Sequence, residues 1–73
     1  MKINIYFNDN YGRDRFVDTC NNSNEIIPKI KKFVKELNKN YKIHYIRTWE
    51  EEGKTWYDVG SHSEFFFTEK VDE

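Results

Sequence analysis

Hydrophobic and polar residues alternate at the start of this 73-residue chain in the pattern of a β-hairpin. The segment KINIYFN, residues 2–8, has the period of two that is typical of a strand with one buried face. The following residues, NDNYGRD, are rich in Asn, Asp and Gly and predict a turn. A second strand from about Arg13 to Thr19, with Phe16 as its main apolar residue, would complete the hairpin.

After Cys20 the spacing changes to that of an amphipathic helix. Its apolar residues fall within one sector of about 100°, and they are Ile26, Ile30, Phe33, Val34 and Leu37. Lysines project from the opposite side, at Lys31, Lys32, Lys35 and Lys39. We therefore expect a helix that packs on a sheet with one face and ends near residues 38–40.

The start of this helix conflicts with Pro28. Ser23 or Asn24 can accept hydrogen bonds from the first free amides of the helix. Pro28, however, lacks an amide, and its ring would clash with the carbonyl of Asn24. The first turn is therefore expected to be irregular, or to begin later than the cap indicates.

The second half of the chain returns to strand patterns. YKIHYIRTW (residues 41–49), TWYDV (55–59) and EFFFTEK (64–70) each predict a strand. Between the first two, EEEGK predicts a hairpin turn with positive φ at Gly53, and GSHS predicts a tight link. The order β-β-α-β-β-β with short links predicts a single α+β domain, an antiparallel sheet with one amphipathic helix on one face.

The register of the hairpin around Gly53 decides which side chains share a face of the sheet. A two-residue turn that ends at Gly53 pairs Trp49 with Trp56 and Arg47 with Asp58. A three-residue loop that ends there would shift both pairings by one residue. We favour the first register because both of its cross-strand pairs are attractive.

Aromatic residues are frequent, since Trp, Tyr and Phe make up 18% of the chain. One helix covers only one face of a sheet, whereas TWYDV and EFFF carry apolar residues at both odd and even positions. Some rings must therefore lie on the face away from the helix, the open face, and the candidates are Trp49, Trp56, Tyr57, Phe65, Phe66 and Phe67. Monomers rarely leave such an area bare, so we expect a second copy, as in a homodimer, or another partner to cover it.

Charge is separated along the chain although the formal net charge is only -1. Residues 29–42 hold six lysines against one glutamate, and residues 49–73 hold eight acids against two lysines. The simplest interpretation is that both regions are solvated faces. The alternative is a dipolar surface that steers a charged partner or a second copy of the chain.

The sequence favours a soluble protein of the cytoplasm. A single cysteine, Cys20, excludes an internal disulfide and is expected to be a small buried or strand-end thiol in a reducing compartment. The first residues lack a signal-peptide pattern, and no stretch is long and apolar enough to span a membrane. We therefore expect no contact with membranes.

One short segment combines the residue types of a nucleophile, a base and a carboxylate, at Ser61, His62, Ser63 and Glu64. Neighbours in a tight turn point apart, whereas the residues of a catalytic triad converge from distant positions, so we do not expect catalysis. The simplest interpretation is a turn shaped by Gly60. The alternative is a small anion-accepting concavity in which the turn's amides and hydroxyls lie beside His62, Arg47 and the tryptophans.

No pattern of a metal or cofactor site occurs, because His44, His62 and Cys20 lack the paired spacing of zinc ligands and no nucleotide-binding fingerprint is present. We expect a non-enzymatic protein without metal or cofactor. Aromatic residues interleaved with Lys42 and Arg47 on a sheet would suit a single-stranded nucleic acid. We do not expect direct nucleic-acid binding, because acids lie on the same hairpins, at Glu50, Glu51, Glu52, Asp58 and Glu64.

The segment IRTWEEEGKTWYDVGSHSEFFF, residues 46–67, resembles a group of short uncharacterised proteins encoded by phages and prophages of Firmicutes-like bacteria. The resemblance rests on the Arg-Thr-Trp, the Gly turn and the Gly-Ser-His-Ser-Glu-Phe-Phe sequence, and the amphipathic helix precedes them at a similar place. It implies an accessory phage protein that acts in the host cell. Small phage proteins of this kind are often inhibitors of bacterial defence, including anti-CRISPR proteins.

These observations lead to the hypothesis of a phage accessory protein that binds and inhibits a host protein, such as a CRISPR effector, through its open face and acidic hairpin. Arg47, Trp49 and Trp56 are the expected anchors, because truncation of such interface residues costs about 2 kcal/mol or more each. One alternative is a sponge that holds a nucleotide-like signalling molecule between two copies, with Arg47 and residues 60–64 at its phosphate and the tryptophans at its base. A third hypothesis is a self-assembling structural protein.

Overall fold

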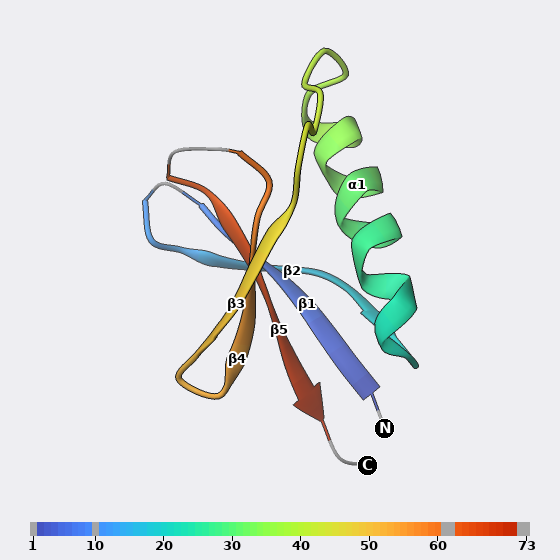
Figure 1. The fold of residues 1–73 in the computed structure, drawn as a ribbon, viewed down its shortest axis with the longest axis vertical. Coiled ribbons are helices and arrows are strands. Elements are labelled where there is room, and N and C mark those ends of the chain that lie inside the picture. The colour runs from blue at the N-terminus through green and yellow to red at the C-terminus, as the bar shows by residue number, and fades with distance from the viewer. Residues whose placement is uncertain (1, 10, 61–62, 72–73) are drawn as a thin grey trace.

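An antiparallel sheet with one α-helix on one face forms the fold (Figure 1). The computed structural model describes residues 2–9, 11–60 and 63–71. Its strands are β1 (Lys2–Asn8), β2 (Asp14–Cys20), β3 (Arg47–Glu51), β4 (Lys54–Asp58) and β5 (Phe65–Val71). A 3₁₀ turn (Ser23–Glu25) leads into the helix α1 (Ile26–Leu37), which lies between β2 and β3 in the chain. The expected α+β class is confirmed.

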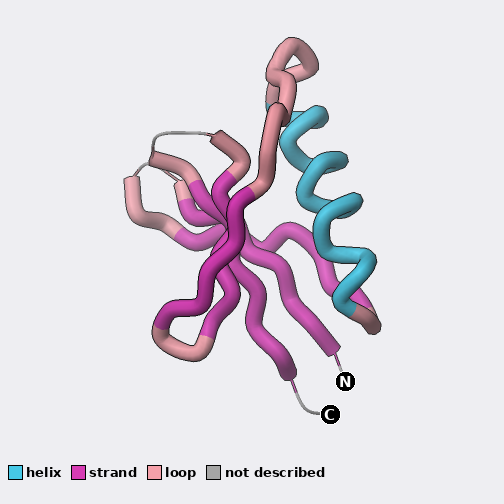
Figure 2. Tube along the Cα trace, in the orientation of Figure 1, coloured by secondary structure: helices cyan, strands magenta, loops and turns pink. Residues whose placement is uncertain are grey.

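The last strand of the chain lies in the middle of the sheet. The spatial order is β2-β1-β5-β4-β3, so β5 pairs with β1 on one side and with β4 on the other. The order of elements along the chain does not specify this arrangement, in which β5 joins the two hairpins into one sheet. The sheet is strongly twisted, and its strands fan out in Figure 2.

A bulge in the first hairpin changes which side chains of β2 face the helix. Ile5 pairs with Asp18 and Tyr6 pairs with Phe16, so Val17 is an extra residue on β2. Val17 is half-buried against the core, and Phe16 reaches the open face together with its partner Tyr6. The bulge therefore places the neighbouring apolar residues Phe16 and Val17 on opposite faces of the sheet.

The core lies between α1 and the sheet. Ile26, Ile30 and Val34 of α1 are buried against the strands, and their partners in the sheet include Ile3, Ile5, Phe7, Tyr57 and Phe66. The apolar sector predicted for the helix is thus its buried face at these three residues, whereas Phe33 is half-buried and Leu37 is 51% exposed. An ion pair also joins α1 to β2, since Lys29 Nζ donates to Asp18 Oδ2 at 2.9 Å. This hydrogen bond lowers the pKa of Asp18 and raises the pKa of Lys29.

The irregular helix start that Pro28 imposes is confirmed. The 3₁₀ turn begins after Asn22, rather than after the expected caps Ser23 or Asn24, and α1 begins only at Ile26. Pro28 is thereby the third residue of α1, where an amide would have no partner within the helix in any case. The Glu25 carboxylate accepts the backbone amides of Asn21 and Asn22, each at 3.3 Å.

The strand predicted for residues 41–49 is wrong over its first six residues, because only Arg47–Glu51 pairs with a neighbour. Residues 41–46 have no regular structure and run beside α1 towards β3 (Figure 1). Their apolar side chains extend the core instead of alternating, at Tyr41, Ile43 and Ile46, whereas Tyr45 is 56% exposed. The Tyr41 hydroxyl donates to the Val59 carbonyl at 2.7 Å and ties this segment to the end of β4.

The second hairpin has the favoured register. Trp49 pairs with Trp56 and Arg47 pairs with Asp58. The two turn residues, Glu52 and Gly53, have φ angles of 55° and 76°. Positive φ at both central positions is the mark of the type I′ turn, whose twist matches that of the strands.

A substitution at Glu52 tests the turn. A positive φ destabilises the fold when most residue types occupy the position, and less so when Asn does. Glu52→Asn should therefore stabilise the fold by about 0.5–1 kcal/mol. In a domain of this size that corresponds to a rise in Tm of about 2–8 °C. Glu51→Asn is the matched control, because it removes the same charge from an exposed strand position next to the turn. Equal stabilisation by both variants in thermal melts would mean that charge repulsion, and not the turn, is relieved.

Candidate interaction surface

A continuous row of aromatic rings crosses the open face and takes one residue from each of the five strands described above. This aromatic row consists, from β2 to β3, of Phe16, Tyr6, Phe67, Trp56 and Trp49. Neighbouring ring centroids are 5.8, 5.1, 4.9 and 6.4 Å apart in that order. Phe65 adds an edge contact to Trp49 at 5.9 Å.

The strand register produces this row. Tyr6 is paired with Phe67, and Phe67 with Trp56, so these side chains leave the sheet on the same face and at the same level. The predicted pairing of Trp49 with Trp56 extends the row to the edge strand β3. The expectation that one helix leaves rings on the far face is confirmed, although Tyr57 and Phe66 belong to the core on the helix side.

The rings of the row shield one another in part. Phe67, at its centre, is only 2% exposed, and Lys54 Nζ lies 4.7 Å from the centre of its ring. Four further rings of this face are half-buried, namely Tyr6, Trp49, Trp56 and Phe65. Phe16, at the β2 end, is 56% exposed. Phe16 is therefore the most accessible ring of the row, and Phe67 at its centre is the least accessible.

One polar atom in the row has no partner. Trp56 Nε1 is buried and donates no hydrogen bond to any part of the chain that the structure describes. A buried donor without an acceptor costs about 1–3 kcal/mol. The row thus carries an energetic cost in the isolated chain.

Arg47 and Asp58 meet at the β3–β4 side of the open face. Arg47 Nη2 donates to Asp58 Oδ2 at 2.8 Å, and the Gly60 amide donates to Asp58 Oδ1 at 2.8 Å. Asp58 is 5% exposed, whereas the Arg47 side chain is 71% exposed and lies 5.9 Å from the Trp49 ring. Asp58 therefore fixes β3 to the start of the following turn, and a phosphate at Arg47 would have to compete with its carboxylate.

The turn after β4 is described in part. Gly60 has a φ of 94°, which confirms the unusual backbone expected for it. Ser61 and His62 lie outside the described residues, and Ser63 is exposed. Glu64 lines a hollow on the helix side with Phe7 and Tyr41, so it does not join the aromatic row. The structure thus brings together Arg47, Trp49, Trp56 and Asp58, and it separates Glu64 from them.

The prediction that the chain has no metal site involves His62, which lies outside the described residues. Within the described ranges no three His, Cys, Asp or Glu side chains gather as metal ligands. His44 is exposed and Cys20 is 3% exposed at the end of β2. Similarly, no described helix is long and apolar enough to cross a membrane.

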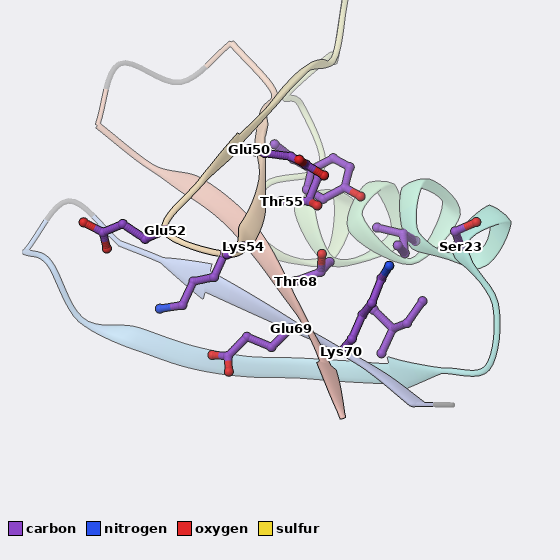
Figure 3. Close-up of a pocket in the computed structure, with 12 residues that line it drawn as sticks. Ser23, Glu50, Glu52, Lys54, Thr55, Thr68, Glu69 and Lys70 are labelled. Carbon is purple, nitrogen blue, oxygen red and sulfur yellow. The ribbon is translucent and has the colours of Figure 1, made fainter. Parts of the chain in front are cut away.

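A polar groove on the helix side was missed by the sequence analysis. It has a volume of about 460 Å³ and lies between the start of α1 and the sheet. Figure 3 shows Ser23 from the turn before α1, Glu50 and Thr55 from the second hairpin, and Thr68 and Lys70 from β5 around it. The available signal was the cross-strand pair of Thr55 with Thr68, two polar residues at positions where alternation places the core. At its floor, burial raises the pKa of Tyr57, and a hydrogen bond with Thr68 opposes this effect.

Cys20 should be an inert thiol. It is buried at the end of β2, and this burial raises the pKa of its thiol above the ordinary value. A thiol-reactive dye should therefore label the folded protein at least about 100-fold more slowly than the urea-unfolded chain at neutral pH. Similar labelling rates in both states would show that the end of β2 opens readily.

Substitutions at Asp58 should separate its two roles. Asp58→Ala removes the acceptor of both Arg47 and the Gly60 amide, and we expect a loss of about 2–4 kcal/mol in the free energy of unfolding. Asp58→Asn keeps an oxygen for Gly60 and should lose about half as much in urea unfolding experiments. Equal losses would mean that the charge opposite Arg47, and not the bond to Gly60, is what Asp58 contributes.

Comparison with known proteins does not assign this chain to a family. No protein-family model, no curated protein and no solved structure matches the chain. The resemblance to phage-encoded proteins in residues 46–67 therefore stays a prediction.

Proposed function

We propose that this chain is a non-enzymatic phage accessory protein that binds a host protein through the aromatic row and inhibits it. The target class that we favour is a bacterial defence component such as a CRISPR effector. The observation that carries the proposal is the aromatic row itself, which extends from one edge of the sheet to the other.

The residues at the ends of the row have the chemistry of interface anchors. Tryptophan, tyrosine and arginine dominate the energetics of protein interfaces. Trp49 and Arg47 lie together on the edge strand β3, and Phe16 lies exposed on the edge strand β2. Because contacts within the row already fix these rings, a partner would lose little side-chain entropy in binding them.

The charge beside the row favours a basic partner. Glu50, Glu51 and Glu52 are exposed at the tip of the second hairpin, where Glu51 shares the face of Trp49 and the other two line the polar groove on the helix side. An acidic hairpin tip complements a cationic surface, whereas Arg47 and Lys54 add positive charge to the aromatic row itself. Proteins that hold nucleic acids present cationic surfaces for the phosphate backbone. A nucleic-acid-binding defence effector therefore fits this end of the molecule.

Of the expected anchors, Trp56 is a less suitable residue for mutagenesis than Trp49 and Arg47. Trp56 lies inside the row, between Phe67 and Trp49, and its indole nitrogen is buried. Its truncation would disturb the row itself and would not isolate a contact with the partner. Trp49, Arg47 and Phe16 are therefore the residues to test.

Inhibition can be measured as the plating efficiency of a phage on cells whose CRISPR immunity targets it. Expression of the wild-type chain should restore plating. Trp49→Ala and Phe16→Ala should each lose most of this effect, because anchors of this kind contribute about 2 kcal/mol or more to binding. Tyr11→Ala is the matched control, since Tyr11 is 77% exposed in the turn between β1 and β2, outside the aromatic row, and it should retain full protection.

Two outcomes would contradict the proposal. If the wild-type chain restores plating against none of several CRISPR types, a CRISPR effector is not its target. Equal loss in Tyr11→Ala and Phe16→Ala, with all variants folded by circular dichroism, would show that the aromatic row is not the binding surface. Light scattering on the pure chain distinguishes self-assembly, because a homodimer closed through the row should dissociate when Phe16 or Trp49 is truncated.

A further inference from the structure

A second surface lies on the helix side, between α1 and residues 41–46. Two hollows of about 250 Å³ each adjoin there, and both are lined by Lys31 and Ile43. We call them together the lysine groove, and the residues that the following argument uses are Lys31, Lys35, Lys39, Tyr41, Ile43 and Tyr45.

One wall of the groove carries several lysines and, among the described acids of the same helix, Glu36. Lys29 is paired with Asp18, but Lys31, Lys35 and Lys39 form no ion pair with any described residue. Lys31 and Lys35 are one helical turn apart, about 6 Å along the axis, and like charges at this spacing destabilise a helix. An anionic ligand with regularly spaced charges would relieve this repulsion.

The other wall carries rings that are held in place. Tyr41 is fixed by its hydrogen bond to Val59. Tyr45 packs on Gly60, where a Cβ atom would lie 3.9 Å from the Tyr45 ring, and yet Tyr45 is 56% exposed. A third hollow, of about 440 Å³, continues past Tyr45 and is also lined by Lys42. The exposed Tyr45 ring therefore lies between a hollow lined by Lys31 and one lined by Lys42.

Three of the acids that argued against nucleic acid, Glu50–Glu52, lie far from this groove, whereas Asp58 is paired with Arg47 and Glu64 lines an adjoining hollow with Tyr41. The tip of the second hairpin, with Glu50–Glu52, and the C-terminal end of α1 lie at opposite ends of the molecule (Figure 1), whose longest extent is 37 Å. Screening at physiological salt acts over about 8 Å. The negative hairpin therefore has little effect on the potential at Lys35 and Lys39, in spite of the net charge of -1.

We propose that the lysine groove binds single-stranded nucleic acid. The lysines hold successive phosphates, and Tyr45 stacks an unpaired base, in the combination by which many proteins bind single strands. An acidic peptide would match the lysines but would make no use of an exposed ring, and the bases of a duplex are stacked out of reach of it. The groove lies on the opposite side of the sheet from the aromatic row, so this inference is independent of the proposed function.

Fluorescence anisotropy tests the inference with labelled oligonucleotides of about 15 thymidines or uridines, at about 50 and 200 mM salt. The wild-type chain should bind, and the stronger of the two oligonucleotides identifies DNA or RNA as the source. Lys35→Gln should reduce the slope of log K against log salt by about 0.7, the contribution of one phosphate contact in a single strand. Tyr45→Ala should weaken binding about fivefold or more and leave the salt slope unchanged, because stacking releases no counterions.

Each variant has a matched control. Lys70→Gln removes an exposed charge from β5, outside the groove, and Tyr11→Ala removes an exposed ring from the turn between β1 and β2. Both controls should bind like the wild type, and circular dichroism should show all four variants folded. Losses that match those of Lys35→Gln and Tyr45→Ala would overturn the assignment to this groove.

Three further results would overturn the proposal. The first is no change in anisotropy at the lower salt concentration up to about 100 μM protein, which is the weak limit of non-specific binding. The second is binding of a glutamate peptide of similar length as tightly as the oligonucleotide, which would assign the groove to an acidic protein segment. The third is equal binding of a duplex, which would show that the rings do not contribute.

Discussion

The pairing of β5 with both β1 and β4 is the constraint on which the other features depend. Because successive residues of a strand point to opposite faces, two neighbouring phenylalanines of β5 serve two different layers. Phe66 is 1% exposed in the core under α1, and Phe67 is 2% exposed at the centre of the aromatic row. A slip of β5 by one residue would exchange the two rings and disrupt both layers at once. The central position of β5 therefore holds the core and the open face in register.

Local rules account for the parts of the structure that the sequence predicts. The turn at Glu52 and Gly53 sets the register of the second hairpin, and with it the pairs that form one end of the candidate surface. Tyr6 and Phe16 could not be assigned to the same surface, because their place beside Trp56 depends on where β5 lies and on the bulge at Val17. Both are tertiary effects, which no period along the chain encodes.

The path of residues 41–46 is the second feature that the sequence did not predict. The sequence of residues 41–46 alternates like that of a strand, but the segment does not pair with a strand. It is held against α1 by burial of Tyr41, Ile43 and Ile46 and by the hydrogen bond from Tyr41 to Val59. Because this path creates one wall of the lysine groove, the groove could not be predicted from the sequence either. The separation of charge along the chain, by contrast, was visible in the sequence, and in the fold the acidic tip of the second hairpin lies at the opposite end of the molecule from the C-terminal end of α1.

The bulge at Val17 and the charges on β3 also affect the tendency of this protein to aggregate at high concentration. Exposed edge strands invite other chains to add on, and a sheet with so many rings would favour the growth of fibrils. At the β2 edge, the extra residue Val17 disturbs the regular ladder that an added strand needs. At the β3 edge, an identical strand would bring the carboxylates of Glu50 and Glu51 close to their own copies in a parallel, in-register stack. The two margins of the sheet thus protect a ring-rich polypeptide from amyloid-like polymerisation.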